Sequence, residues 1–495
     1  MADYDSDYDL AIIGGGLNGA SLARDAAGRG LRVVLIEQGD LASAASSAGP
    51  PLIHGDPGLL EHRRWWRVRT QLTERERWMK NAPHLVRPMR FALPLHPQER
   101  PPSLLRAGLL FYDRLAGATA LGPSETVDVT HHPIGNPLQR PFGIAFEYSD
   151  GLADVTRLVV ASAVDAAERG AVIMTGARCV RAERESTWRL AVIDRGHRRL
   201  ITSRALANAT GAWAQIVNET ILRQPVLSRQ LHAVQVSQIV LPRLFDTENV
   251  YVFQHRDGRL IFASPLARDF TLVGSITRPF TGDPAIVAMP AADIGYFCDA
   301  LARYLRAPLH PTDVVRTLSG VNLVQERKGV PRDGVLLFDH GRRRAPLITL
   351  LGGEITTARR RAERAVSLLT PFYPMSPRWT ADARLPGGDF AWDRFEDEVD
   401  MARQRWRFLG EPEARRLVSA YGSRLAHVLG DAKSRDDLGQ AFGPELTAAE
   451  VRYLMTKEWA RFPEDILWRR TKLGLTMAAA DRDALAVFMG GVPAA

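Results

Sequence analysis

The chain has 495 residues, more than one compact core usually holds, so we expect two or three domains. Hydrophobic residues make up 45% of the sequence and charged residues 24%, a composition that excludes a disordered chain. The net charge of +8 favours anionic partners, but because no nucleic-acid-binding motif accompanies it, we expect no nucleic acid partner.

The N-terminus and the cysteines exclude further classes. The opening sequence MADYDSDYDL is acidic and lacks the basic and apolar regions of a secretory signal. No apolar run reaches the roughly 18 residues that a membrane-spanning helix needs. Cys179 and Cys298 lie far apart without metal-ligand spacing, so we expect neither a disulfide framework nor a metal site. The expected location is the cytoplasm.

The clearest predicted unit covers residues 8–37. A short apolar strand at 8–13 precedes a glycine-rich turn, and an alanine-rich helix over 20–30 follows the turn. A second apolar strand at 31–36 ends at Glu37. This order of elements is typical of the first half of a dinucleotide-binding fold.

The turn in this unit carries the fingerprint Gly14-x-Gly16-x-x-Gly19. Its glycines allow a tight turn, a close approach of the backbone to a pyrophosphate, and close packing of helix on strand. The N-terminus of the helix offers amide hydrogens to the phosphates. Glu37, 18 positions after Gly19, is placed to accept hydrogen bonds from a ribose.

Two later segments favour FAD over NAD as the cofactor. The first is Thr210-Gly211 at the end of a strand predicted at 204–209, and the second is Gly352-Gly353 after a strand at 347–351. Thr356 and the residue after it open a helix there, and a helix N-terminus near the flavin stabilises the anion that forms on reduction. We therefore predict FAD.

The remaining elements divide the chain further. Helices are predicted over 61–84, 104–115 and 157–170, short antiparallel strands over 225–290, and mainly helix over 393–490. The expected fold class is α/β, with a doubly wound FAD-binding domain of the glutathione-reductase-like kind, an antiparallel substrate domain and a helical C-terminal domain. The expected ranges are 1–90, 145–224 and 340–375 for the FAD-binding domain, 91–144 and 225–339 for the substrate domain, and 385–495 for the C-terminal domain.

Further stretches of the chain match the motifs of one known family. They include IIGGGLNGASLARDAAGR at 12–29, SSA at 46–48, LIHG at 52–55, FEYSD at 146–150, LPGG at 385–388 and LWRRTK at 467–472. With them the chain resembles the FAD-dependent, quinone-linked glycerol-3-phosphate dehydrogenases over nearly its whole length. The resemblance implies oxidation of sn-glycerol 3-phosphate to dihydroxyacetone phosphate, with electrons passed to quinone at a membrane surface.

The cofactor motifs of this family are intact in the chain. They supply the glycine turns, the acidic strand end and the helix N-termini that the phosphates and ribose of FAD require. The residues expected to contact FAD are Gly14, Gly16, Asn18, Gly19, Glu37, Ser46, Ser47, Thr210, Gly211, Gly353 and Thr356.

The substrate motifs of the family are altered at several positions. The replacements are Pro51 and Glu354 for lysines, Gly58 and Asn322 for arginines, Gln238 for a histidine, Leu59 for a tyrosine and Asp56 for a glycine. A phosphate dianion needs cations with well-aimed donors, and added carboxylates oppose it. Glutamine cannot accept the proton of a hydroxyl, so the expected base is missing as well. The family histidine His54 remains, with a catalytic and a structural role equally weighted.

Three hypotheses for the function follow. The chain oxidises glycerol 3-phosphate with rearranged residues, Arg359 or Arg90 supplying the lost charge. Alternatively, it is an FAD oxidoreductase for a different, non-phosphorylated substrate that is neutral or cationic, or it is a non-catalytic FAD-binding paralogue.

The partners expected on these grounds are a small-molecule substrate, a quinone as electron acceptor and a second copy in a homodimer. Peripheral contact with the inner face of a membrane is a further hypothesis. It rests on Trp65 and Trp66 with their flanking arginines, and on the apolar segment 104–115 with Arg106 and Arg114.

Overall fold

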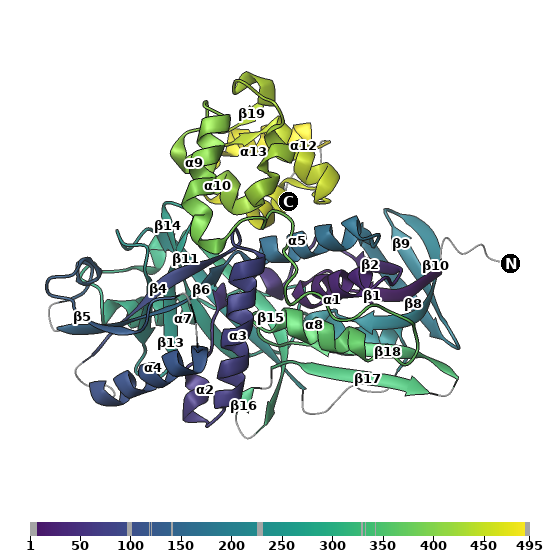
Figure 1. Ribbon diagram of the computed structural model, residues 1–495, viewed down its shortest axis with the longest axis horizontal. Coiled ribbons are helices and arrows are strands. Elements are labelled where there is room, and N and C mark those ends of the chain that lie inside the picture. Colours follow the sequence, from purple (N-terminus) through teal and green to yellow (C-terminus); the bar gives the residue numbers. More distant parts are fainter. Residues whose placement is uncertain are drawn as a thin grey trace.

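The computed structural model of the chain consists of two sheets with their helices and a helical C-terminal part (Figure 1). In Figure 1 the C-terminal helices, in green to yellow, stand above the two sheets. The structure describes residues 7–96, 101–117, 119, 121–139, 142–224, 231–327, 330–331, 333–341 and 343–490.

The first sheet is the doubly wound one that the sequence predicts. Its strand order is β17-β18-β10-β1-β2-β7, and β8 and β9 extend β10 as an antiparallel hairpin. Helices α1 (Leu17–Gly28), α5 (Val155–Glu168) and α8 (Ala358–Ser367) pack together beside this sheet. The strands are β1 (Asp7–Ile13), β2 (Val33–Glu37), β7 (Val172–Thr175), β8 (Ala177–Arg184), β9 (Trp188–Asp194), β10 (His197–Asn208), β17 (Val335–Gly341) and β18 (Arg344–Leu351).

The register of the parallel strands brings their carboxyl ends to one edge of the sheet. Ile13 of β1 lies opposite both Ile36 of β2 and Asn208 of β10, and Asn208 lies opposite Thr349 of β18. The segments that follow these strands therefore meet at one place, although up to about 340 residues of sequence separate them. In doubly wound folds this edge is where ligands bind.

Small side chains explain the close packing of α1. Ala20, Ala23 and Ala26 are fully buried along one face of this helix, which contacts both α5 and α8. Alanine combines high helix propensity with a minimal side chain, so neighbouring helices approach closely. The alanine-rich helix that the sequence predicts is thus the central helix of this layer.

The second sheet is mainly antiparallel, as predicted. Its strand order is β16-β15-β11-β14-β13-β12-β4-β6-β3, with β5 pairing β6. One pairing, between β4 and β12, is parallel. The strands are β3 (Leu52–Ile53), β4 (Val86–Pro94), β5 (Glu125–Asp128), β6 (Ile144–Ala153), β11 (Leu231–Pro242), β12 (Val250–Gln254), β13 (Leu260–Leu266), β14 (Phe270–Pro279), β15 (Arg316–Arg327) and β16 (Val330–Pro331). The division into three domains at the expected boundaries stays a prediction.

Four more helices accompany the second sheet. The short α2 (Gly58–Glu61) leads into α3 (Trp65–Asn81), which packs on α4 (Pro102–Ala116), and α7 (Ala291–Ala302) contacts strands β11, β12 and β14. The sequence predicts both α3 and α4. Among the described residues, no helix combines the length and apolarity needed to cross a membrane.

The C-terminal part has a hydrophobic core of its own, built from buried side chains between Phe390 and Leu485. Its helices are α9 (Phe395–Arg405), α10 (Glu411–Tyr421), α11 (Leu425–Leu429), α12 (Ala448–Lys457) and α13 (Ala479–Phe488), and a two-stranded sheet joins β19 (Ala441–Phe442) and β20 (Leu446–Thr447). The predicted helical C-terminal domain is confirmed.

His84 lies buried where this domain meets the rest of the chain. Side chains at Gly387 and Gly422 would each come within 3.0 Å of its ring, and the Phe390 ring lies tilted beside it with ring centroids 6.4 Å apart. Among the described residues its Nδ1 atom has no hydrogen-bond partner, and burial lowers the pKa of His84 from 6.5 to about 3, with Arg157 adding to the effect. The imidazole is therefore neutral in the folded protein.

The neutral state of His84 makes stability depend on pH. Between about pH 6.5 and pH 3, His84 is protonated in the unfolded chain but not in the folded protein. The free energy of unfolding therefore falls by up to about 1.4 kcal/mol for each pH unit of acidification. His84→Gln should remove this dependence. Urea denaturation at pH 7.5 and pH 5 measures it, and an equal loss of stability in both proteins would contradict the assignment.

Candidate functional site

Two backbone hydrogen bonds hold the glycine turn between three strands. Gly14 N–H donates to Ile36 O and Ala209 N–H donates to Ile13 O, each at 2.9 Å. Gly14 has a φ of +109°, and a Cβ there would lie 2.5 Å from Ala209 O. A Cβ on Gly19 would lie 1.8 Å from Gly14 O. The turn thus requires glycine at both positions.

The N-terminus of α1 forms a cradle beside this turn. Gly16 is the N-cap residue and offers no side-chain cap, while Ser46 Oγ accepts the N–H of Leu17 at 3.1 Å. A Cβ on Gly16 would meet one atom within 4 Å, Ser46 Oγ at 3.2 Å. The first turn of α1, which the structure describes in full, has no acidic residue. Amide hydrogens and a hydroxyl at a helix N-terminus fit a phosphate group.

Glu37 borders the cradle at the end of β2. Its carboxylate accepts the N–H of Gly15 at 2.6 Å and that of Gly39 at 2.8 Å. Burial raises the pKa of Glu37, and these backbone donors oppose the rise. An acidic side chain fixed at this point suits the hydroxyls of a ribose.

Three other predicted cofactor residues lie in turns, where the hydroxyls of two of them bond to neighbouring residues. Thr210 Oγ1 donates to Asn208 Oδ1 at 2.7 Å, Gly211 has a φ of +58° at the start of a short helix, and Ser47 Oγ donates to Ala44 O at 2.8 Å. Thr210 and Gly211 follow β10, so they lie at the same sheet edge as the fingerprint turn. Their contacts with FAD stay a prediction.

The loop after β18 joins the fingerprint helix through Asn18. Asn18 Nδ2 donates to Gly352 O at 3.0 Å, and Asn18 Oδ1 accepts two bonds from Arg361, each at 3.0 Å. A Cβ on Gly353 would lie 2.3 Å from the Arg361 guanidinium, which also bonds Asp333 at 3.1 Å. Arg361 therefore fills the space beneath the loop.

Sequence reasoning missed Arg361. It belongs to a run of three arginines that reads as a solvated helix face, but its side chain is 7% exposed. Burial lowers its pKa, and the charge of Asp333 opposes that shift. A cation in the first turn of a helix is electrostatically unfavourable, so its place here depends on the carboxylate and on Asn18. Helical spacing from Ala358 and Ala362 is the signal that indicates the buried face.

His54 follows β3 and faces the second sheet. Its backbone N–H donates to Thr356 Oγ1 at 3.1 Å, and the Thr356 hydroxyl donates back to His54 O at 3.2 Å. Its ring lies edge-on to Phe262, with centroids 6.1 Å apart. Burial raises the pKa of nearby Asp150, while Arg75 and His54 oppose the rise. The histidine thus lies between the loop that follows β18 and strand β13 of the second sheet.

Gln238 and Asn322 lie on the face of the second sheet that packs against residues 45–48. In the β11–β15 register Gln238, Gly320 and Asn322 project to the same side, and a Cβ on Gly320 would lie 2.9 Å from Ala45 Cα. Gln238 is buried and donates from Nε2 to Ala48 O at 2.6 Å. The amide therefore fastens the segment that carries Ser46 and Ser47 to the sheet.

Glu354 turns away from the glycine loop toward α3. Arg67 donates to it at 2.7 Å and Gln71 also hydrogen-bonds to it. Burial and the charge of Asp333 raise the pKa of Glu354, and Arg67 opposes the rise. The carboxylate that replaces the family lysine thus takes part in an ion pair with another segment of the site.

The other altered positions serve local structure. Asp56 Oδ1 accepts the N–H of Gly58 at 2.9 Å, and Leu59 is buried in a hydrophobic cluster. Of the two arginines considered as replacements, Arg359 makes two bonds to Glu74, at 2.7 and 2.8 Å. Arg90 bonds the carboxylates of Glu125 and Glu147. Both arginines are thus engaged by carboxylates.

Comparisons with known proteins agree with this geometry. Residues 9–359 match the family described as FAD dependent oxidoreductase, and residues 378–490 match the C-terminal domain of alpha-glycerophosphate oxidase. The chain is 38% identical to a glycerol-3-phosphate dehydrogenase of Pseudomonas aeruginosa, over 97% of this chain and 95% of that protein. It is 39% identical to a D-erythritol 1-phosphate dehydrogenase of Brucella abortus, over 96% of each.

A solved structure confirms the fold. The glycerol-3-phosphate dehydrogenase of Bacillus halodurans, complexed with FAD, superimposes with a TM-score of 0.76 at 24% identity, covering 98% of this chain and 89% of that one. Together with the family match, this identifies FAD as the cofactor. The fingerprint turn, the cradle at α1 and Glu37 fit the pyrophosphate and ribose of that group.

Gly16→Ala tests the cradle. Its methyl group contacts one hydroxyl in the protein but would occupy the space of a phosphate, so we expect the chain to fold and its affinity for FAD to fall by about tenfold or more, which is about 1.4 kcal/mol. Gly295→Ala in α7 is the matched control, because a Cβ there meets nothing within 4 Å. Titration of the apoprotein with FAD measures both. Unchanged affinity in Gly16→Ala would place the phosphates elsewhere.

Proposed function

The chain belongs to the FAD-dependent oxidoreductases and, within them, to the glycerol-3-phosphate dehydrogenase family. We therefore propose that it oxidises a small substrate and reduces FAD. We propose further that this substrate carries no phosphate group and is neutral or cationic. The observation that supports this is the carboxylate of Glu354, which lies in the loop after β18 and forms an ion pair with Arg67.

Electrostatics argues against a phosphate dianion beside Glu354. Phosphate sites in proteins use arginine or lysine donors aimed at the anion. Here Arg67, Arg90 and Arg359 are each bonded to carboxylates. Two like unit charges 4 Å apart repel by about 4 kcal/mol near a protein surface, so a phosphate would have to displace these pairs at considerable cost. A hydroxyl or an ammonium group has no such conflict.

The residues of the chain divide the remaining tasks. Bound FAD supplies the hydride acceptor. His54, held by Thr356 and packed against Phe262, is the proposed base that takes the proton from the substrate hydroxyl or amine. Gln238 cannot take a proton, and it holds the serine segment in place. Glu354 is the proposed acceptor for a substrate hydroxyl or ammonium hydrogen.

Anaerobic titration of the holoprotein tests the substrate class. We expect sn-glycerol 3-phosphate to leave the oxidised flavin band unchanged, because the carboxylates repel it, and a neutral or cationic compound to bleach the band. Glycerol, D-erythritol, glycine and proline are suitable first probes. Bleaching by glycerol 3-phosphate at comparable concentration would contradict the proposal. A flavin that dithionite reduces but none of the tested compounds reduces would favour a non-catalytic paralogue.

The variant Glu354→Lys serves this titration as the charge test. It should strengthen binding of sn-glycerol 3-phosphate at least tenfold, seen as a perturbed flavin spectrum. Glu185→Lys is the matched control, since it makes the same charge change at a side chain that is 64% exposed and bonded to Arg189 in the β-hairpin of the first sheet. Equal binding by both variants would show that overall charge, and not Glu354, governs the effect.

We also propose that a quinone accepts the electrons at the inner face of a membrane. The support is an exposed apolar surface on α3 and α4, formed by Trp65, Trp66, Leu104, Leu110 and Phe111. The two tryptophans lie edge to face and Arg64 lies over Trp66, 5.2 Å from its ring centroid. In Figure 1 α2 and α4 lie on the side of the molecule away from the C-terminal domain. Aromatic and basic side chains together favour an anionic interface.

Vesicle co-sedimentation tests this surface. The protein should sediment with vesicles that contain anionic lipid and less with neutral ones, and combined Trp65→Ser, Trp66→Ser and Phe111→Ser substitutions should lower the bound fraction severalfold because less apolar area is buried. Ile286→Ser is the control, since that side chain is 82% exposed elsewhere on the molecule. Equal sedimentation of the triple variant and the original chain would overturn the assignment.

A further inference from the structure

The C-terminal domain forms ion pairs with the loop that follows Glu37. Asp40 in this loop is 8% exposed, and Arg470 of the C-terminal domain makes two bonds to it, each at 2.7 Å. Arg469 bonds the same carboxylate. We propose that the C-terminal domain holds the ribose-binding loop of the FAD site in place, with Arg470 as the positioning residue. The proposal rests on FAD binding at the fingerprint turn and on the role expected of Glu37.

The loop is bonded to both parts of the adenosine site. Gly39 N–H donates to the Glu37 carboxylate at 2.8 Å, and Ala42 N–H donates to the carbonyl of Gly15 at 3.1 Å. Asp40 lies between these two residues. A shift of Asp40 therefore moves both Gly39, which donates to the Glu37 carboxylate, and Ala42, which donates to the glycine turn.

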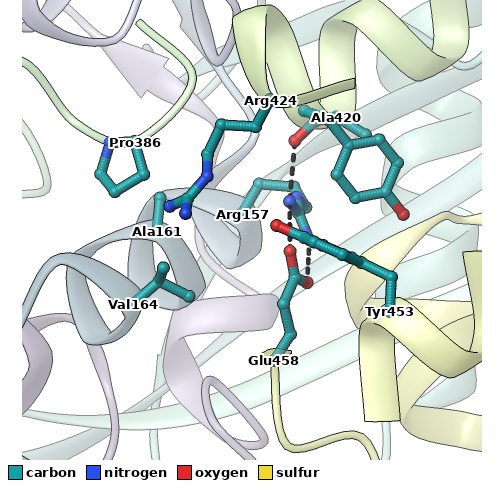
Figure 2. Close-up of a pocket in the computed structure, with 9 residues that line it drawn as sticks. Arg157, Ala161, Val164, Pro386, Ala420, Arg424, Tyr453 and Glu458 are labelled. Carbon is teal, nitrogen blue, oxygen red and sulfur yellow. Dashed lines mark hydrogen bonds and ion pairs between the residues drawn. The ribbon is translucent and has the colours of Figure 1, made fainter. Parts of the chain in front are cut away.

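The Arg470–Asp40 ion pair belongs to a buried network of charged side chains. Arg470 also donates to the carbonyl of Glu458 at 2.8 Å, and Glu458 pairs with Arg157 of α5, with one bond at 2.9 Å. Figure 2 shows both bonds of this pair and a further bond from Arg157 to the carbonyl of Ala420, at 2.7 Å. Arginine in bidentate pairs fixes direction as well as distance. Arg157 and Glu458 thus hold the segment that presents Arg470.

A third pair extends the contact to the start of α5. Lys472 bonds both oxygens of Asp154, the N-cap residue of α5, at 2.7 and 2.6 Å. The motif LWRRTK, at 467–472, therefore delivers three cations to two carboxylates of the FAD-binding fold. The Arg470–Asp40 and Arg157–Glu458 pairs are buried, so solvent weakens them little and loss of one partner leaves a buried charge unpaired, whereas the Lys472–Asp154 pair is partly exposed.

Removal of Arg470 should act on the cofactor. Asp40 would keep Arg469 but would lose the partner that makes two bonds to it. Burial and the charge of Asp40 raise the pKa of nearby Asp465, so the two carboxylates repel each other. The loop would then relax, and Glu37 and the glycine turn would lose their fixed spacing. The adenosine half of FAD should therefore bind more weakly, while the flavin loop after β18 keeps its own contacts.

The experiment titrates the full-length apoprotein with FAD and, separately, with ADP as a probe of the adenosine half. Arg470→Gln should weaken both by at least tenfold and by similar factors, and Arg470→Lys should recover part of the loss. Arg424→Gln is the matched control, because it breaks a pair with Glu168 at the same domain interface but away from the loop. It should change both affinities less than twofold. The thermal midpoint of each apoprotein shows that it is folded.

Two results would overturn the inference. One is Arg470→Gln with FAD and ADP affinities within twofold of the original chain. The other is a loss for FAD without a loss for ADP, which would place the effect at the flavin half. Asp40→Asn tests the same pair from the other side if Arg470→Gln does not fold. Failure of the original chain to bind FAD would instead contradict the FAD assignment itself.

Discussion

The alignment of the parallel strand ends is the constraint on which the rest of the structure depends. The hydrogen bonds from Gly14 to Ile36 and from Ala209 to Ile13 lock the glycine turn between three strands. They leave no space for a Cβ at Gly14, and they place Glu37 and Thr210 beside the N-terminus of α1. The cofactor site is therefore a consequence of sheet register, and its side chains refine it.

The two sides of the site differ in their electrostatics. On the adenosine side, small residues and helix amides create a place for phosphates without any lysine or arginine at the turn. On the proposed substrate side, burial and the nearby charges of Asp333 and Asp56 raise the pKa of Glu354, while Arg67 opposes the rise. The family's substrate is an anion, and that the chain departs from the family mainly in the charge on this side, with the cofactor motifs preserved, stays a prediction from the sequence.

Buried arginines connect the parts of the molecule. Arg359 joins α8 to α3 through Glu74, Arg157 joins α5 to the C-terminal domain through Glu458, and Arg470 joins that domain to Asp40. Each of these three cations is neutralised by a carboxylate, so none of them contributes to the net charge of +8. Each pair fixes geometry more than it adds stability, since desolvation offsets most of the attraction.

The sequence by itself determined the fingerprint turn, the doubly wound fold and the helical C-terminal domain, because these follow from glycine spacing and apolar periodicity within short windows. FAD followed from the order of distant turns, at 210–211 and 352–353, and from the family resemblance. The sequence also predicted which substrate positions depart from the family. Only the tertiary structure decided how the charges pair. Arg67 and Glu354 are 287 residues apart, and Arg470 and Asp40 are 430 apart. Ion pairs across such separations leave no local pattern, since any of 64 cations can meet any of 56 carboxylates until the fold brings two together.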